Sequence, residues 1–132
     1  MKIAYITYNG SGKYLPANDF NEVEDLLPFL QRKGLDITAE IWDNPGTDWK
    51  KYDVALLKTP WDYHQKYGQF KEWLDRIEAL GVQLLNDFDT VRWNMDKHYL
   101  AGIAQAGLDV IPAIFLEKEW KGELLPLFEK LQ

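Results

Sequence analysis

The chain has 132 residues, of which 46% are hydrophobic, and it carries a formal net charge of −6 and no cysteine. This length fits one ordinary domain with a core of its own, and the six tryptophans and seven tyrosines argue against disorder. The negative charge disfavours nucleic acids and membrane surfaces as partners, because both present phosphates. The missing cysteines exclude disulfides and thiolate metal sites, and two histidines, His64 and His98, cannot form a structural zinc site by themselves.

The sequence also indicates in which cellular compartment the protein is found. No apolar run approaches the roughly 18 residues that a transmembrane helix needs. The first residues lead directly into a strand-like run that is too short for a signal peptide. We therefore expect a cytoplasmic protein.

The first part of the chain alternates strand-like and helix-like patterns. Apolar runs predict strands at residues 2–8, 35–42, 54–57 and 82–85. Apolar stripes at helical spacing predict one helix over residues 23–33 and another over residues 70–80, each followed by a glycine. Pro28 lies inside the first of them, so that helix is either kinked there or begins near Asp25. The alternation predicts an α/β fold with a mostly parallel, Rossmann-like sheet and helices on both faces.

The pattern changes from Asp87 onward. We expect a helical turn at residues 91–93, a helix capped by Asn94 and ending at Gly107, an apolar run at residues 113–116, and a helical pattern over residues 122–132. The predicted domains are therefore residues 1–88 and residues 89–132.

Ligands of parallel sheets bind beyond the carboxyl ends of the strands, so the residues after each strand are candidate contacts. Tyr8 ends the first predicted strand and is a candidate substrate contact. The next segment, Gly10-Ser11-Gly12-Lys13, resembles a phosphate loop in composition but not in spacing, because Thr7 and Tyr14 occupy the positions of the Walker glycine and hydroxyl residue. We predict a flexible turn there.

A second candidate segment runs from Lys58 to His64, after the third predicted strand. It combines a cation, a hydroxyl group, a carboxylate, an imidazole and two aromatic rings in seven residues. Thr59, Trp61, Asp62 and His64 are candidate substrate contacts, and Asp62 and His64 could share a proton, because an imidazole titrates near neutrality. In the alternative interpretation Trp61 and Tyr63 anchor the loop on the core, while Asp62 caps the next turn.

A third candidate is Lys97, at the start of the helix expected after the fourth strand. A cation is slightly disfavoured near a helix N-terminus, so a lysine there invites a functional explanation. The alternative is a solvated surface lysine near Asp96.

These segments together resemble the ATP-grasp superfamily, and most of all its prokaryotic glutathione synthetase-like branch, which includes a cycloserine-forming ligase. The resemblance covers most of the chain and is best over residues 54–112. It is carried by Thr59-Pro-Trp-Asp-Tyr-His64, Leu85-Asn86-Asp87, Val91-Arg-Trp-Asn-Met-Asp-Lys97 and Ala106-Gly107-Leu-Asp-Val-Ile-Pro112.

The resemblance implies a three-lobed enzyme in which an α/β domain binds substrate and two further lobes hold ATP and Mg²⁺. Residues 1–88 would be the first domain, residues 89–132 would open the ATP-grasp domain, and Lys97 would reach the nucleotide phosphates. Such enzymes activate a carboxylate as an acyl phosphate, which an amine then attacks. The later nucleotide lysine, the glycine-rich loop and the metal ligands are not found in these 132 residues. We therefore expect an N-terminal fragment that is inactive alone and holds neither cofactor stably, in an enzyme whose substrate is a small carboxylate or amino-acid-like compound.

Two other functions remain open. One is a separate flavodoxin-like binding or regulatory module, although a signalling receiver would need acidic residues where this chain has Tyr8-Asn9 and Lys58-Thr59. The other is a small interaction protein that forms homo-oligomers through exposed apolar residues.

Overall fold

The structure is a computed structural model that describes residues 1–10 and 22–129. The chain divides into two compact units, Met1–Arg92 and Trp93–Gln132, and each unit is described by itself. In the described ranges we find no helix that is both long enough and apolar enough to cross a membrane. The predicted turn at residues 10–13 lies, after Gly10, outside the described residues.

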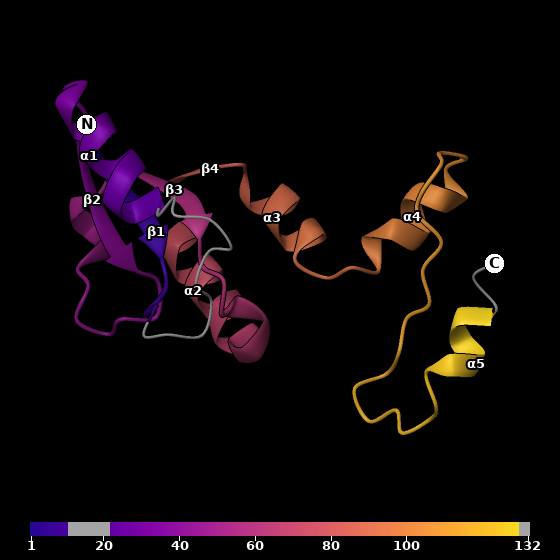
Figure 1. Ribbon diagram of the computed structural model, residues 1–132. Coiled ribbons are helices and arrows are strands. Elements are labelled where there is room, and N and C mark those ends of the chain that lie inside the picture. Colours follow the sequence, from indigo (N-terminus) through magenta and orange to yellow (C-terminus); the bar gives the residue numbers. More distant parts are fainter. Residues whose placement is uncertain (11–21, 130–132) are drawn as a thin grey trace. The chain divides into compact units, whose positions relative to one another are not determined.

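A four-stranded, all-parallel sheet forms the centre of the first unit (Figure 1). Its strands are β1 (Lys2–Thr7), β2 (Asp36–Ile41), β3 (Val54–Thr59) and β4 (Gln83–Leu85), in the spatial order β2-β1-β3-β4. The four predicted strands and the predicted parallel α/β fold are confirmed. The chain leaves β1 toward one edge of the sheet and β3 toward the other, so the topology reverses between these two neighbours.

Two helices of this unit connect the strands. The first, α1 (Leu27–Arg32), follows a wider π-helical segment, η1 (Glu22–Leu26), and the second is α2 (Tyr67–Ala79). Pro28 lies in the first turn of α1, directly after the π-helical segment. The proline therefore marks the start of the regular helix rather than a kink within it.

The strands bury alternate side chains on the two faces of the sheet. Ile3 and Tyr5 of β1 pack with Leu27 of α1 in one core cluster. Ala4 and Ile6, which are fully buried, point to the opposite face. Right-handed crossovers in opposite directions place α1 and α2 on opposite faces, as predicted.

An aromatic cluster joins α2 to the segment that follows β2. Phe70 and Trp73 of α2 stack with ring centroids 5.4 Å apart, and Trp42 meets Phe70 edge-on at 5.3 Å. Trp49 meets Trp73 at 5.6 Å. These four side chains are at most 5% exposed, so much of the tryptophan content forms core rather than surface.

The boundary between the units falls within α3 (Phe88–Asn94), and the predicted boundary at residues 88/89 falls at the start of this helix. The second unit contains α4 (Tyr99–Gln105) and α5 (Leu125–Phe128). The expected cap at Asn94 is wrong, because Asn94 ends α3 and His98 precedes α4. Asp96 explains the difference: its carboxylate accepts the backbone N–H of His98 at 3.0 Å and holds a turn between the helices. The assignment of the two units to ATP-grasp lobes stays a prediction.

Candidate functional site

The candidate site lies at the carboxyl ends of β1 and β3, where the topology of the sheet reverses. Thr7 and Thr59 end these strands, and their buried hydroxyl groups are 2.9 Å apart. The register changes just before them, since Ile6 pairs with Leu57 but Thr7 pairs with Thr59. Lys58 is thus the extra residue of a bulge, a feature that redirects side chains near functional sites. Parallel α/β sheets bind their ligands at such reversal points.

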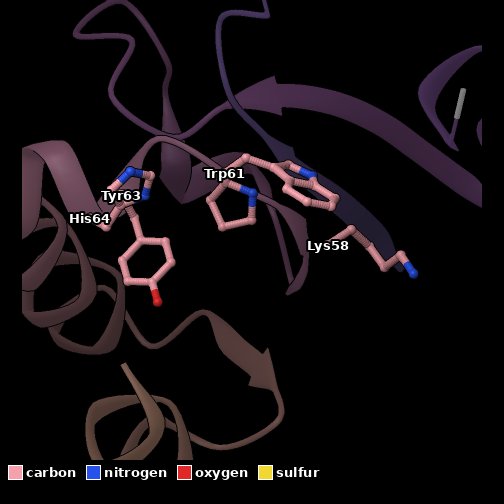
Figure 2. Close-up of a pocket in the computed structure, with 5 residues that line it drawn as sticks. Lys58, Trp61, Tyr63 and His64 are labelled. Carbon is pink, nitrogen blue, oxygen red and sulfur yellow. The ribbon is translucent and has the colours of Figure 1, made fainter. Parts of the chain in front are cut away.

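A pocket of about 430 Å³ opens beside this bulge (Figure 2). Its lining residues are Lys58, Pro60, Trp61, Tyr63 and His64. The volume is in the range of sites for small molecules. Trp61 is 54% exposed, which leaves a large aromatic surface available to a ligand. The walls of the pocket are therefore mostly apolar and aromatic, and Figure 2 shows the ammonium of Lys58 directed away from Tyr63 and His64.

The cation, Lys58, is joined to the π-helical segment before α1. Its ammonium lies 3.0 Å from a carboxylate oxygen of Glu22. The buried hydroxyl of Tyr5 donates to the same oxygen at 3.0 Å. Burial raises the pKa of Tyr5, the nearby Glu22 raises it further, and the Thr59 hydroxyl opposes this only in part. The phenol therefore remains protonated at neutral pH and acts as a donor to Glu22.

Asp62 has a different environment from the rest of its loop. Only 8% of the residue is exposed, and its two carboxylate oxygens accept from Trp42 Nε1 and Lys66 Nζ, each at 2.8 Å. Lys66 also pairs with Asp43. Burial raises the pKa of Asp62, but the hydrogen bonds from Lys66 and Trp42 outweigh this and hold it below its usual value. Asp62 is therefore a charged group that fastens its loop to the end of β2.

The anchoring interpretation of this loop is correct in part. Tyr63 packs on Phe70 at 5.2 Å, and so anchors the loop, whereas Trp61 is exposed. Asp62 precedes a short 3₁₀ turn, η3 (Tyr63–Lys66), but its side chain does not cap that turn. His64 is exposed and faces the pocket beside Tyr63, at a ring distance of 6.0 Å.

The sheet brings the predicted contacts of the first unit to one edge. Tyr8 is half-buried directly after β1, next to Thr59 at the end of the neighbouring strand. Trp61 and His64 line the pocket, while Thr59 and Asp62 are buried behind the surface. Substrate binding by these five residues stays a prediction.

Lys97 belongs to the second unit. It lies in the turn just before α4 rather than in the first turn of the helix, and its carbonyl accepts the N–H of Leu100 at 3.1 Å. The side chain is exposed, with its ammonium 5.4 Å from the ring centre of Tyr99. Its predicted contact with ATP stays a prediction.

Three polar residues of the site were not among the predicted contacts. Lys58 was noted only as part of its segment, although a lysine at the end of an apolar strand is itself a signal. Thr7 could have been found as the last residue of the first strand. Glu22 gave no signal, because its partners Tyr5 and Lys58 are far away in sequence.

The described residues do not fit a magnesium site. Within residues 1–10 and 22–129, no three histidine or acidic residues gather closely enough to hold a metal ion. For ATP they offer Lys97 as one exposed cation, and α4 is only seven residues long. A single lysine can contact a phosphate but cannot enclose a nucleotide.

Comparison with known proteins relates this chain to a protein named for cycloserine biosynthesis. Residues 3–86 match the family model described as the N-terminal domain of D-cycloserine synthetase DcsG. The cycloserine biosynthesis protein DcsG of Streptomyces lavendulae is 31% identical over 91 residues, which are 67% of this chain and 30% of that protein.

A solved structure gives the same result for the fold. The crystal structure of D-cycloserine synthetase DcsG superposes with a TM-score of 0.69 and 25% identity, and the alignment covers 85% of this chain and 36% of that one. The chain spans about a third of the length of the proteins it matches. The family model covers most of the first unit, including β1 to β4 and the pocket. The chain therefore belongs to the family of N-terminal domains of the D-cycloserine synthetase DcsG.

Proposed function

We propose that this chain is the N-terminal, substrate-binding part of an ATP-dependent carboxylate-amine ligase of ATP-grasp type. Membership of the DcsG N-terminal family supports this, because the relative is named as a synthetase. The resemblance of the segment from Thr59 to Pro112 to the ATP-grasp superfamily agrees with it. The enzyme would act in the cytoplasm.

The observation that carries the proposal is the pocket at the reversal point of the sheet. Its chemistry suits a small carboxylate or amino-acid-like substrate. Trp61 offers an apolar surface, His64 offers an imidazole at the rim, and Lys58 would supply a positive charge for a carboxylate at the edge of the pocket. Asp62 and Tyr63 would hold the loop in place.

The nucleotide part of the proposal concerns the second unit. Lys97 would contact the phosphates of ATP, and other parts of the intact enzyme would hold Mg²⁺. When bound, ATP would supply the phosphoryl group that activates the substrate carboxylate. The role of the first unit would be to hold the substrate in a fixed orientation, which lowers the barrier of the reaction by positioning.

The test is ADP release by the intact natural protein that contains this chain, with ATP, Mg²⁺ and a panel of small amino acids. We expect release that depends on one class of amino-acid substrate. Trp61→Ala should raise KM for that substrate about tenfold and leave KM for ATP unchanged, since a large aromatic contact is worth about 1.5 kcal/mol or more.

A matched control is Tyr67→Ala, because Tyr67 is an exposed aromatic residue of the same unit that does not line the pocket. This variant should behave as the unmodified protein. ADP release that ignores every amino acid, or equal KM changes in both variants, would contradict the proposal. Amino-acid binding without ADP release would instead favour a binding module.

A further inference from the structure

Lys66 lies outside the pocket and joins two segments at this edge of the sheet. It ends the 3₁₀ turn η3, four residues after Asp62, and does not line the pocket. Its ammonium contacts the carboxylates of Asp62 and Asp43 and lies 5.7 Å from the ring centre of Trp42. Asp62 belongs to the loop after β3, whereas Trp42 and Asp43 follow β2. Because β1 lies between these strands, Lys66 links the ends of two strands that are not neighbours in the sheet.

The segment after β2 is the well-packed side of this link. The N–H of Trp42 donates to the carbonyl of Thr7 at 3.0 Å and so continues the pairing of β2 with β1. The Trp42 ring is buried against the aromatic residues of α2. Its indole N–H donates to Asp62 at 2.8 Å. The loop after β3 is therefore attached through Asp62 to the core of the first unit.

The attached loop carries two of the residues that line the pocket. Trp61 directly precedes Asp62, and His64 follows it two residues later. Trp61 is 54% exposed, so packing on the core does little to fix its position. Tyr63 fastens the loop to α2, and Asp62 fastens it to the segment after β2. The position of the Trp61 ring therefore depends on the backbone that these two side chains hold.

We propose that Lys66 is a positioning residue for the pocket, and that it sets the place of Trp61 by holding the carboxylate of Asp62 against Trp42. The inference rests on the proposed function, because the pocket is the proposed substrate site. It extends that function to a residue that lies outside the pocket.

The charges explain why the loop needs Lys66. Asp43 and Asp62 bind the same ammonium, so the two carboxylates repel each other at short range once that cation is removed. Burial raises the pKa of Asp62, but the hydrogen bonds from Lys66 and Trp42 outweigh it, so the carboxylate is charged at neutral pH. A buried carboxylate that loses its cation is strongly destabilised. Without Lys66, Asp62 regains water only if the loop moves away from Trp42.

Heteronuclear NMR of the tryptophan indole N–H groups tests the attachment in the intact natural protein without substrate. An indole N–H that donates to a carboxylate resonates downfield and exchanges slowly with water. Lys66→Met should move the Trp42 signal upfield, speed its exchange and shift the Trp61 signal. The signal of Trp49, which is buried in the core, reports whether the variant is folded. Unchanged Trp42 and Trp61 signals would overturn the proposal.

Two further substitutions at the same position separate the charge from the fold. Lys66→Arg keeps the cation and should keep both signals near their original positions. Lys66→Gln keeps a hydrogen-bond donor without the charge and should change both signals in the same direction as Lys66→Met, but less. If Lys66→Met does not fold, Lys66→Gln decides the question, and unchanged signals in this variant would contradict the proposed role.

ADP release separates positioning from a general loss of structure. Lys66→Met should raise KM for the amino-acid substrate about tenfold, as Trp61→Ala does, and leave KM for ATP unchanged. In a protein that already carries Trp61→Ala, the same substitution should have little further effect, because Lys66 acts through Trp61. Effects of the two substitutions that simply multiply, or equal rises in both KM values, would show that Lys66 does not position this wall.

Lys51→Met is the matched control. Lys51 also pairs with a carboxylate, that of Glu40 at 3.1 Å, and its ammonium lies 4.8 Å from the ring centre of Tyr52. It lies in a separate 3₁₀ turn, η2 (Trp49–Lys51), and does not line the pocket. This variant should leave the two KM values and the Trp61 signal unchanged. Changes as large as those of Lys66→Met would mean that any lost ion pair of the first unit disturbs the pocket.

The two readouts distinguish this inference from the proposed ligase. ADP release with KM values and indole signals that ignore Lys66 would overturn the inference and keep the ligase. Shifted Trp42 and Trp61 signals in Lys66→Met, without ADP release by the unmodified protein, would overturn the ligase and keep Lys66 as the residue that positions the loop.

Discussion

Apolar residues at helical spacing are buried in the first unit of the chain and exposed in the second. In the first unit, the helical stripe of α2 is buried, with Leu74 and Ile77 fully inaccessible. In the second, Leu125 and Phe128 of α5 are 72% and 59% exposed. Among the described residues after Arg92, Met95 alone is buried. Helical spacing determines which side chains share a face, but burial requires a second surface, which the aromatic side chains of Trp42, Trp49 and Tyr63 help to supply to α2.

The largest expected effect tests this difference in burial. Leu74→Ala should lower the free energy of unfolding by about 2 to 5 kcal/mol, because it removes buried methyl groups and leaves a cavity. Leu125→Ala is the same substitution at an exposed position and should change it by less than about 0.5 kcal/mol. Urea unfolding followed by circular dichroism measures both. Similar losses would mean that α5 is packed as tightly as α2, and the comparison would fail.

The same contrast explains how far the sequence predicted the fold. The four strands of the first unit and the two helices that connect them followed from apolar spacing, because local pattern and tertiary packing agree there. The wrong cap at Asn94 came from the second unit, where the local hydrogen bond from His98 to Asp96 sets the start of α4. With little burial to constrain it, that boundary depends on one short-range contact that propensity does not reveal.

The site was predictable where it depends on strand ends, and not where it depends on distant contacts. Trp61 and His64, which line the pocket, were predicted as contacts because they follow a buried strand, and their binding of a substrate stays a prediction. Glu22 was missed, since its contacts with Tyr5 and Lys58 exist only after the sheet has formed. The inward orientation of Asp62 was missed for the same reason, because its partner Trp42 follows a different strand.

A second prediction concerns the buried charge of Asp62 and its effect on the stability of the first unit. Asp62→Asn should lower the free energy of unfolding by about 1 to 3 kcal/mol at neutral pH, since Lys66 and Trp42 lose a charged acceptor. The pKa of Asp62 is lowered in the folded state, so its stabilisation is present above the unfolded pKa and is lost as the pH falls through the folded value. The difference between the two proteins should therefore shrink below about pH 4.

Asp109→Asn provides the control from the second unit, because Asp109 is exposed. Its unfolding curve should follow that of the unmodified protein within about 0.5 kcal/mol at every pH. An Asp62→Asn difference that persists unchanged into acid would show that the charge of Asp62 is not the stabilising feature.

The smallest expected effect on stability belongs to Lys97. The side chain is exposed and lies just before α4, so Lys97→Ala should change the free energy of unfolding by less than about 0.5 kcal/mol. If Lys97 contacts a phosphate, the same substitution should weaken ATP binding by the intact protein about tenfold, because one charge-assisted hydrogen bond is lost.

The control is Lys118→Ala, at another exposed lysine of the second unit, which should change neither the free energy of unfolding nor the ATP affinity. Calorimetric titration with equal ATP affinities for the two variants would remove Lys97 from the nucleotide site. A selective loss would show that the second unit, which buries little, contributes to function through its exposed surface.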